Sequence, residues 1–266
     1  MNARVVAVTN QKGGVGKTTT TINLAASLAL ADQKVLVVDV DPQANLTSGV
    51  GLRGQAAAAG SIYDALTASG TTPDPTAFIL PTAVDSLMAI PADRSLTGAE
   101  IELVTLSDRE YRLRRFLAPM RDQFDSIFID CPPSLGLLTL TALVAADSVL
   151  IPLHCEYFAL EGLADLVATL RRVRASLNPA LDIEGVLLTM HDERTNLSQQ
   201  VSKDIREFFK EKVFETSIPR NVRLAEAPSH GKPVLLYDVK SRGALAYVSL
   251  AREVITRRGR TSGAVA

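Results

Sequence analysis

The fold is decided by Asn10-Gln11-Lys12-Gly13-Gly14-Val15-Gly16-Lys17-Thr18-Thr19, a stretch that lies where an apolar strand should end and a helix should begin. Phosphate-binding loops usually read G-x-x-x-x-G-K-[ST], and their glycines let backbone N–H groups close around phosphate oxygens. Here Gly16-Lys17-Thr18 match the end of the pattern, Gln11 replaces the first glycine, and Lys12 adds a second lysine. Apolar residues at helical spacing over 19–31 place the N-terminus of a helix at the phosphates.

The polar residues of this loop have expected roles in nucleotide binding. We expect Lys17 to reach the β and γ phosphates as a compact positive charge, and the Thr18 hydroxyl to ligate Mg²⁺. Glycine-rich turns between a strand and a helix also occur without a ligand, but Lys-Thr after a strand favours a nucleotide site. The predicted phosphate-binding residues are Lys12, Gly13, Gly14, Val15, Gly16, Lys17, Thr18 and Thr19.

The loop with its extra lysine resembles the deviant Walker loop of the partitioning and cell-division ATPases, the MinD/ParA family, which also holds nitrogenase iron protein. The resemblance implies ATP and Mg²⁺ as cofactors. It also implies that two nucleotide-bound subunits face each other, and that Lys12 reaches the phosphates of the partner. Taken alone, Lys12 would more often be a solvated loop lysine, but its place within the whole string favours the functional role.

Two carboxylates follow the second predicted strand, in Asp39-Val40-Asp41-Pro42-Gln43. We expect them to face opposite sides, so that one can orient the loop or the metal shell while the other faces the nucleotide. Asp41 is placed to hold or polarise the water that attacks the γ-phosphate. The alternative is an Asp-Pro turn in which Asp41 caps a following helix. In the resembling family this string is the first switch, and its second aspartate is the hydrolytic one.

Another carboxylate, Asp130, ends a later apolar strand in Ile129-Asp130-Cys131-Pro132-Pro133. This is the place of a Walker B-like residue that binds Mg²⁺ through water, and the family has its second switch here. A helix cap or turn residue is the alternative. The predicted metal-binding residues are Thr18, Asp41 and Asp130, and the predicted catalytic residues are Lys12, Lys17 and Asp41.

The apolar runs lack strict alternation, which is typical of strands buried on both faces, and helical patterns separate most of them. This order predicts an α/β fold: a single-domain, doubly wound, mostly parallel sheet with helices on both faces, as in P-loop NTPases. Ligands bind beyond the carboxyl ends of such strands. The predicted strands are 5–8, 35–38, 87–90, 127–129, 149–151 and 183–188, and a short helix is expected near 61–66.

The 266 residues are enough for one large domain, and the formal net charge is −1. We expect residues 1–260 to form this ATPase domain and 261–266 to be a disordered tail. The start of the chain runs directly into a strand without a leader pattern, and no apolar run is long enough to span a membrane. These features predict a cytoplasmic protein, and the resemblance implies that it is nucleoid-associated.

Four later strings fit the chromosomal partitioning ATPases of the ParA/Soj type, and the likeness runs nearly end to end. They are Leu160-Glu161-Gly162-Leu163, Arg194-Thr195-Asn196-Leu197, Pro219-Arg220-Asn221-Val222-Arg223-Leu224 and Ser241-Arg242-Gly243. The resemblance implies that Pro219, Arg220 and Asn221 lie near the adenine. Composition alone indicates only a turn-rich loop.

The same resemblance implies nonspecific binding of double-stranded DNA by arginines of the dimer surface, and Arg194 and Arg223 are the matching positions. A solvated surface arginine is the alternative for each. Residues 194–232 contain eight basic and five acidic residues, and residues 240–266 contain six basic and one acidic. Such patches bind phosphates without reading sequence, and their binding falls steeply with salt.

The leading hypothesis is therefore an ATPase switch with weak intrinsic turnover. ATP and Mg²⁺ close a homodimer that binds DNA, and hydrolysis stimulated by a ParB/Spo0J-type centromere-binding protein releases it. The partner is implied by the resemblance alone.

Three alternatives differ in class. A membrane-surface ATPase like MinD needs an amphipathic terminal helix, but the basic segment 252–260 offers little apolar surface beyond Val254 and Ile255. An iron–sulfur carrier or scaffold needs thiolates at the dimer axis, and the spacing of Cys131 and Cys155 does not fit. A cobyrinic-acid-type amide synthase is disfavoured because 266 residues leave no room for an added glutaminase domain.

Overall fold

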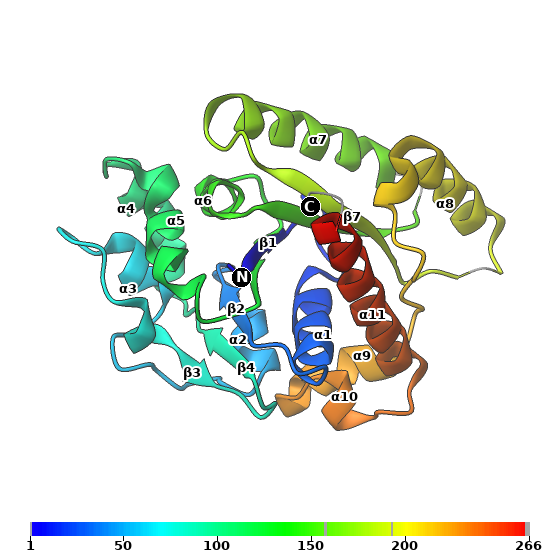
Figure 1. Ribbon diagram of the computed structural model, residues 1–266, viewed down its shortest axis with the longest axis horizontal. Coiled ribbons are helices and arrows are strands. Elements are labelled where there is room, and N and C mark those ends of the chain that lie inside the picture. The colour runs from blue at the N-terminus through cyan, green and yellow to red at the C-terminus, as the bar shows by residue number, and fades with distance from the viewer. Residues whose placement is uncertain (1, 157–158, 193, 264–266) are drawn as a thin grey trace.

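One twisted sheet forms the centre of the protein, and helices cover both of its faces (Figure 1). The computed structural model describes residues 2–156, 159–192 and 194–263. Within them the strand order is β3-β4-β2-β5-β1-β6-β7, and every neighbouring pair is parallel except β3-β4. The strands are β1 Arg4–Val8, β2 Val35–Asp39, β3 Leu80–Pro81, β4 Leu87–Ile90, β5 Ser126–Asp130, β6 Ser148–His154 and β7 Asp182–Thr189.

Helices alternate with these strands along the chain. The α-helices of the described residues are α1 Lys17–Ala29, α2 Asn45–Gly49, α3 Ile62–Thr67, α4 Leu96–Val104, α5 Arg112–Leu117, α6 Leu137–Ala145, α7 Ala159–Ser176, α8 Asn196–Phe209, α9 Val222–Glu226, α10 Val234–Tyr237 and α11 Arg242–Gly263. Short 3₁₀ turns supplement them, among them η5 Ala227–His230. The predicted α/β, doubly wound, mostly parallel fold is confirmed.

Alternation along each strand builds a separate apolar core on each face of the sheet. In β1, Val5 and Ala7 belong to the core beneath α3 to α8, whereas Val6 and Val8 belong to the core beneath α1, α2 and α9 to α11. All four side chains are fully buried. Burial on both faces explains why the strands read as continuous apolar runs.

The six predicted strands are present, and β3 is the one that the sequence did not indicate. It has two residues, one of them Pro81, and pairs antiparallel at the edge of the sheet. A proline cannot donate a ladder hydrogen bond, so such a segment carries no strand pattern. The short helix expected at 61–66 is α3, and Ser61 and Asp64 form a capping box at its start.

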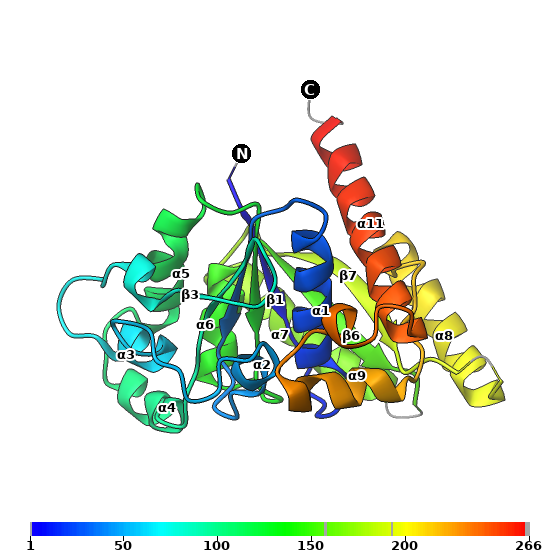
Figure 2. The same ribbon diagram turned by 90° about the horizontal axis from the view of Figure 1, so that it is seen from below.

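The carboxyl ends of the central strands place the candidate site. Val8 of β1 and Asp39 of β2 are both in register with Asp130 of β5. This row of paired residues ends where α1 begins. Figure 2 shows that α2, α4 and α9 also lie at the carboxyl-terminal edge of the sheet. Three strand ends and one helix N-terminus therefore converge on one region.

The last helix differs from the sequence-based expectation at its end. α11 continues to Gly263, although residues from 261 onward were expected to be a disordered tail. Helix propagation is cooperative, so a well-anchored helix extends into residues of weak helical preference. One anchor is the buried Tyr247, whose hydroxyl shares a 3.1 Å hydrogen bond with Thr20 of α1. Residues 264–266 lie outside the described part of the chain.

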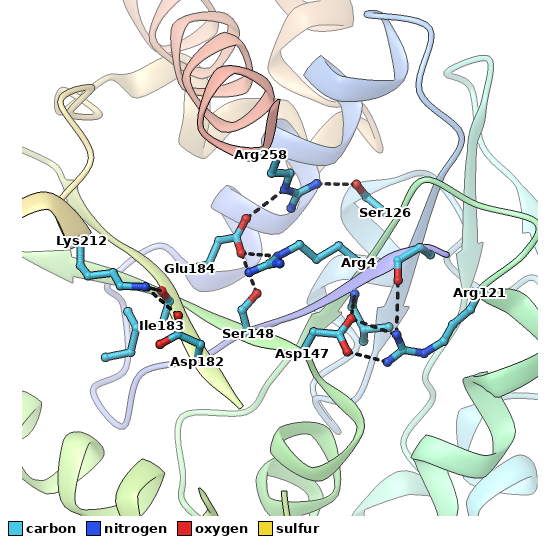
Figure 3. A network of polar contacts seen from close by, with 12 residues as sticks. Arg4, Arg121, Ser126, Asp147, Ser148, Asp182, Ile183, Glu184, Lys212 and Arg258 are labelled. Atoms are coloured by element: carbon cyan, nitrogen blue, oxygen red, sulfur yellow. Dashed lines mark hydrogen bonds and ion pairs between the residues drawn. The ribbon is translucent and has the colours of Figure 1, made fainter. Parts of the chain in front are cut away.

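A second anchor of α11 is a buried ion-pair network at the amino-terminal edge of the sheet (Figure 3). The Glu184 carboxylate accepts hydrogen bonds from Arg4 Nε at 2.7 Å and from Arg258 Nε at 3.0 Å. The Ser148 hydroxyl donates a third, at 2.7 Å, and Arg258 also donates to Ser126. Burial alone would raise the pKa of Glu184, but the charges of Arg258 and Arg4 outweigh it and hold the pKa below its usual value.

We expect Glu184→Gln to lower the free energy of unfolding at pH 7 by about 3 kcal/mol, the low end for a broken buried ion pair because Arg4 is partly exposed. A lowered folded-state pKa stabilises the fold above the unfolded-state pKa, which is about 4.3 for Glu, and this contribution disappears as pH falls through the folded-state pKa. The gap between wild type and variant should therefore close below about pH 4. Urea unfolding across pH measures it.

Asp182→Asn is the matched control for this measurement. It removes the same charge from an exposed pair with Lys212 near the same edge, where Asp182 Oδ2 lies 2.7 Å from Nζ. We expect a loss below about 1 kcal/mol. A Glu184→Gln loss no larger than the control would contradict the anchoring role of the network.

Candidate nucleotide site

The loop between β1 and α1 is held from two neighbouring strands. The Asn10 side-chain nitrogen donates to the Pro152 carbonyl of β6 at 2.8 Å, and its oxygen accepts from the Lys12 backbone at 3.0 Å. The Thr189 hydroxyl of β7 donates to the Val15 carbonyl at 2.8 Å. These contacts fix the path of the loop around a hollow at the carboxyl edge.

Two glycines in the loop have backbone angles that other residues rarely adopt. Gly14 has φ +72° and Gly16 has φ +87°, both in the left-handed region. Gly16 is also the N-cap residue of α1. The glycines therefore allow the chain to turn tightly into the helix and present backbone N–H groups there.

Lys17, the first residue of α1, is buried beneath the loop. Its Nζ donates to the Lys12 carbonyl at 2.9 Å, and 7% of the residue is exposed. Burial lowers the pKa of Lys17, and the charge of Asp130 acts in the opposite direction. The ammonium group thus lies under the loop, where it could meet phosphate oxygens.

A cavity of about 290 Å³ lies over this loop and brings most of the predicted site residues together. Gln43 and Asn45 also line it, although the sequence did not indicate them. Its lining residues are Gly13, Gly14, Gly16, Lys17, Thr18, Thr19, Asp41, Gln43, Asn45 and Pro133. Lys12 is absent from this set and points elsewhere.

The Lys12 side chain is bound within its own subunit. Its Nζ lies 2.7 Å from Glu156 Oε2, just beyond the end of β6. Glu156 also contacts His154, with 2.9 Å between Oε1 and Nδ1. The two lysines of the loop therefore have separate positions, one below the cavity and one beside it.

Asp39 and Asp41 have different surroundings, because Asp39 ends β2 whereas Asp41 lies beyond the strand, directly before the turn at Pro42. Asp39 is fully buried, and its carboxylate accepts from the Thr47 backbone at 2.9 Å and from the Thr47 hydroxyl at 2.7 Å. Asp41 lines the cavity, and its carboxylate accepts from the Gln43 backbone at 3.0 Å. Asp41 thus lies in a turn, and the N-cap of α2 is Ala44, so the alternative of a helix cap is wrong.

Thr47 links this segment to a neighbouring strand. Its hydroxyl accepts a hydrogen bond from the Ala92 backbone, beyond the end of β4, at 2.9 Å while it donates to Asp39. Burial raises the pKa of Asp39, and the bonds from Thr47 act in the opposite direction. Sequence reasoning missed Thr47, because only the folded chain brings it beneath Asp39.

Asp130 has no exposed surface and contacts α1. Its carboxylate accepts from the Thr18 hydroxyl at 2.7 Å and from the Thr21 hydroxyl at 3.0 Å. Burial, followed by the charge of Asp39, raises the pKa of Asp130. The N-cap of α6 is Gly136, so Asp130 does not cap the following helix. Thr21 was missed, although it follows Thr18 at helical spacing.

The oxygen-rich set Thr18, Asp41 and Asp130 suits Mg²⁺, a hard cation that prefers oxygen ligands. No group of three or more His, Cys, Asp or Glu side chains in the described part of the chain could hold a metal ion. These three residues could therefore hold Mg²⁺ only together with oxygens of a nucleotide or water. Both cysteines are buried, and burial raises the pKa of each thiol, that of Cys155 to about 11.

A second cavity, of about 650 Å³, lies beyond the end of β7. Pro219 and Arg220 line it together with His191 and Arg242. Asn221 instead caps α9, and its side chain accepts from the Arg223 backbone at 3.0 Å. Two of the three residues predicted near the adenine thus share a cavity, and the third shapes the turn behind it.

The two predicted DNA-binding arginines form ion pairs. Arg194 makes bonds of 2.8 and 2.7 Å to Asp192, while most of its side chain is exposed. Arg223 lies 2.8 Å from Glu226 and 3.3 Å from Asp238. Neighbouring carboxylates therefore offset part of the positive charge that the sequence alone suggested.

Comparisons with known proteins agree with this geometry. Residues 3–183 match the family described as AAA domain. The chain is 54% identical over 254 residues to the chromosome partitioning protein ParA of Myxococcus xanthus, covering 96% of this chain and 88% of that protein. It is 55% identical over 251 residues to the sporulation initiation inhibitor protein Soj of Bacillus subtilis, with coverage of 94% and 98%.

The chain belongs to the ParA/Soj family of chromosome partitioning ATPases.

A solved structure shares the fold and contradicts the length argument against a cobyrinic-acid-type amide synthase. Cobyrinic acid a,c-diamide synthase from Mycobacterium smegmatis, with bound ATP analogue and magnesium, is 36% identical with a TM-score of 0.82. The match covers 98% of this chain and 97% of that one. Chain length therefore does not separate a ParA/Soj protein from the protein of that name. Sequence identity separates them, because it is 54% to ParA and 55% to Soj but 36% to that protein.

We expect Thr47→Val to lower the free energy of unfolding by about 1–3 kcal/mol, because the buried Asp39 carboxylate would lose one of its hydrogen bonds and the Ala92 N–H would lose its side-chain acceptor. ATP hydrolysis should slow by about tenfold, since the segment that carries Asp41 would shift. Urea unfolding and phosphate release measure the two effects. Thr47→Ser keeps the hydroxyl and should stay close to wild type; equal losses in both variants would exclude the hydrogen bond as the cause.

Proposed function

We propose that this chain is an ATP-dependent partitioning switch. Two subunits enclose ATP and Mg²⁺, the dimer binds double-stranded DNA without sequence preference, and hydrolysis stimulated by a ParB/Spo0J-type protein releases it. The proposal is carried by one observation: a loop with both lysines lies at the N-terminus of α1, in a chain over 50% identical to chromosome partitioning proteins.

In this proposal the loop binds the phosphates of the nucleotide. Backbone N–H groups from Gly13 to Thr19 and the α1 N-terminus stabilise their negative charge, and Lys17 contacts the β and γ phosphates. Lys12 contacts the phosphates of the partner subunit. Bound Mg²⁺ would neutralise part of the negative charge of the phosphates.

Hydrolysis is assigned to the carboxylates at the strand ends. Asp41 lines the cavity, so its carboxylate orients the attacking water. Thr18, Asp41 and Asp130 would hold Mg²⁺ together with oxygens of the nucleotide and water. Asp39 faces Thr47 and not the cavity, so it acts by holding the Asp41 segment in place.

The adenine is proposed to lie at the cavity beyond β7, where Pro219 and Arg220 supply an apolar ring and a planar cation. Asn221 contributes by fixing the start of α9. The DNA surface includes Arg194 and Arg223, which exchange their carboxylate partners for phosphates when DNA binds. Nucleoid association in the cytoplasm follows from this DNA binding.

A membrane-surface role is not favoured by the last helix. Within the described residues, no helix has both the length and the apolar character to cross a bilayer. On α11, Val254 packs into the core with 2% exposed, whereas Ile255 is 36% exposed. Leu245 of the same helix is 57% exposed, but it lies ten residues before Ile255, and membrane insertion requires several apolar side chains together on one face.

We expect Asp41→Ala to bind ATP, dimerise and stay on DNA, while hydrolysis falls to background because no carboxylate orients the water. Lys12→Ala should still bind ATP but lose both the dimer and hydrolysis. Phosphate release, sedimentation with ATP and Mg²⁺, and a DNA mobility shift measure these effects. Normal turnover in Asp41→Ala, or an ATP-dependent dimer in Lys12→Ala, would overturn the assigned roles.

We expect Arg194→Ala and Arg223→Ala to weaken DNA binding equally across sequences and to reduce the slope of log K against log salt by about 1 for each phosphate that the variant no longer neutralises. Binding of the ATP-loaded dimer to duplex DNA at several salt concentrations measures the slope. Arg115→Ala is the control, because Arg115 of α5 is an exposed arginine whose side chain lies 2.9 Å from the Asp108 carboxylate. An unchanged slope in both test variants would remove this surface from the proposal.

A further inference from the structure

Lys12 has a partner within its own subunit that the proposed mechanism does not use. Its ammonium lies 2.7 Å from Glu156 Oε2, and the two side chains are 37% and 48% exposed. The residues are 144 positions apart, so the contact exists only because β1 and β6 are neighbours in the sheet.

The surroundings of Glu156 keep its carboxylate negative and in place. Its backbone N–H donates to the His154 carbonyl at 2.8 Å, and its other carboxylate oxygen lies 2.9 Å from His154 Nδ1. The hydrogen bond from Lys12, and then the charges of His154 and Arg220, hold the pKa of Glu156 below its usual value. Glu156 is therefore ionised at neutral pH and attracts the lysine.

Only the side chain of Lys12 needs to move for this contact to break. The Lys12 backbone N–H is fixed by Asn10, and its carbonyl accepts from Lys17, so the loop itself stays in position. An ammonium group directed at Glu156 cannot at the same time extend to a second subunit. Reaching the partner's phosphates requires the pair with Glu156 to open.

We propose that Glu156 is a positioning residue that holds Lys12 within its own subunit and opposes formation of the nucleotide sandwich until nucleotide phosphates draw the lysine away. This inference rests on the proposed function, in which Lys12 acts across the dimer. Glu156 thereby sets the protein concentration at which ATP produces the dimer.

The exposure of the pair sets the size of the effect. An exposed ion pair shifts an equilibrium by about two- to fivefold, and two such pairs open for each dimer. The expected change in the dimer dissociation constant is therefore about four- to twenty-five-fold. The phosphates of a nucleotide carry several negative charges, so they can outcompete a single partly solvated carboxylate.

The test compares wild type with Glu156→Gln, which removes the charge and keeps the shape. Dimerisation is measured by sedimentation over a range of protein concentrations, with a non-hydrolysable ATP analogue and Mg²⁺. The variant should dimerise more tightly by about four- to twenty-five-fold, and Glu156→Asp should lie between the two. A merely structural role would weaken the dimer, so the direction of the change is diagnostic.

Asp182→Asn is the matched control, because the Asp182–Lys212 pair has the same 2.7 Å length and similar exposure but lies at the edge of the sheet opposite to Lys12 and Glu156. It should leave dimerisation unchanged. If wild type dimerises, Lys12→Ala does not, and Glu156→Gln is equal to or weaker than wild type, the inference fails and the proposed function stands. If wild type forms no dimer with the analogue, or Lys12→Ala dimerises normally, the proposed role of Lys12 fails and the inference falls with it.

Discussion

The buried carboxylate of Asp130 and the two α1 hydroxyls that bind it determine the geometry of the whole site. A carboxylate without exposed surface is tolerated only when hydrogen bonds replace water, and Thr18 and Thr21 provide them. The end of β5 is thereby joined to the first turn of α1. The loop that precedes α1 must then close over a fixed helix N-terminus, with Lys17 beneath it.

Strand register extends this constraint to the neighbouring segments. Asp39 stands beside Asp130 in the sheet, and its carboxylate holds Thr47, which in turn accepts a bond from the loop after β4. Asp41 lies two residues further on and reaches the cavity. A buried carboxylate therefore fixes the segment, while a second one next to it remains available for chemistry. The short D-x-D string combines structural support and reactivity in this way.

The sequence predicted the elements that depend on local pattern. Apolar runs located six strands, and the loop from Asn10 to Thr19 located α1 and most of the cavity lining. The sequence did not predict contacts between distant segments: Glu156 contacts Lys12, 144 positions away, and Glu184 contacts Arg4, 180 positions away. For a similar reason, counting residues did not show which carboxylates Arg194 and Arg223 contact.

The length of α11 adds a mechanical consequence to its two anchors. Tyr247 ties the helix to α1 beside the nucleotide loop, and Arg258 ties it to the opposite edge of the sheet. From Tyr247 to Gly263 the helix spans about 24 Å, so a tilt of about five degrees at Tyr247 would carry its far end by about 2 Å. The buried carboxylate of Glu184 resists this swing. A small rotation of α1 would therefore strain the ion pair between Arg258 and Glu184 at the opposite edge of the sheet.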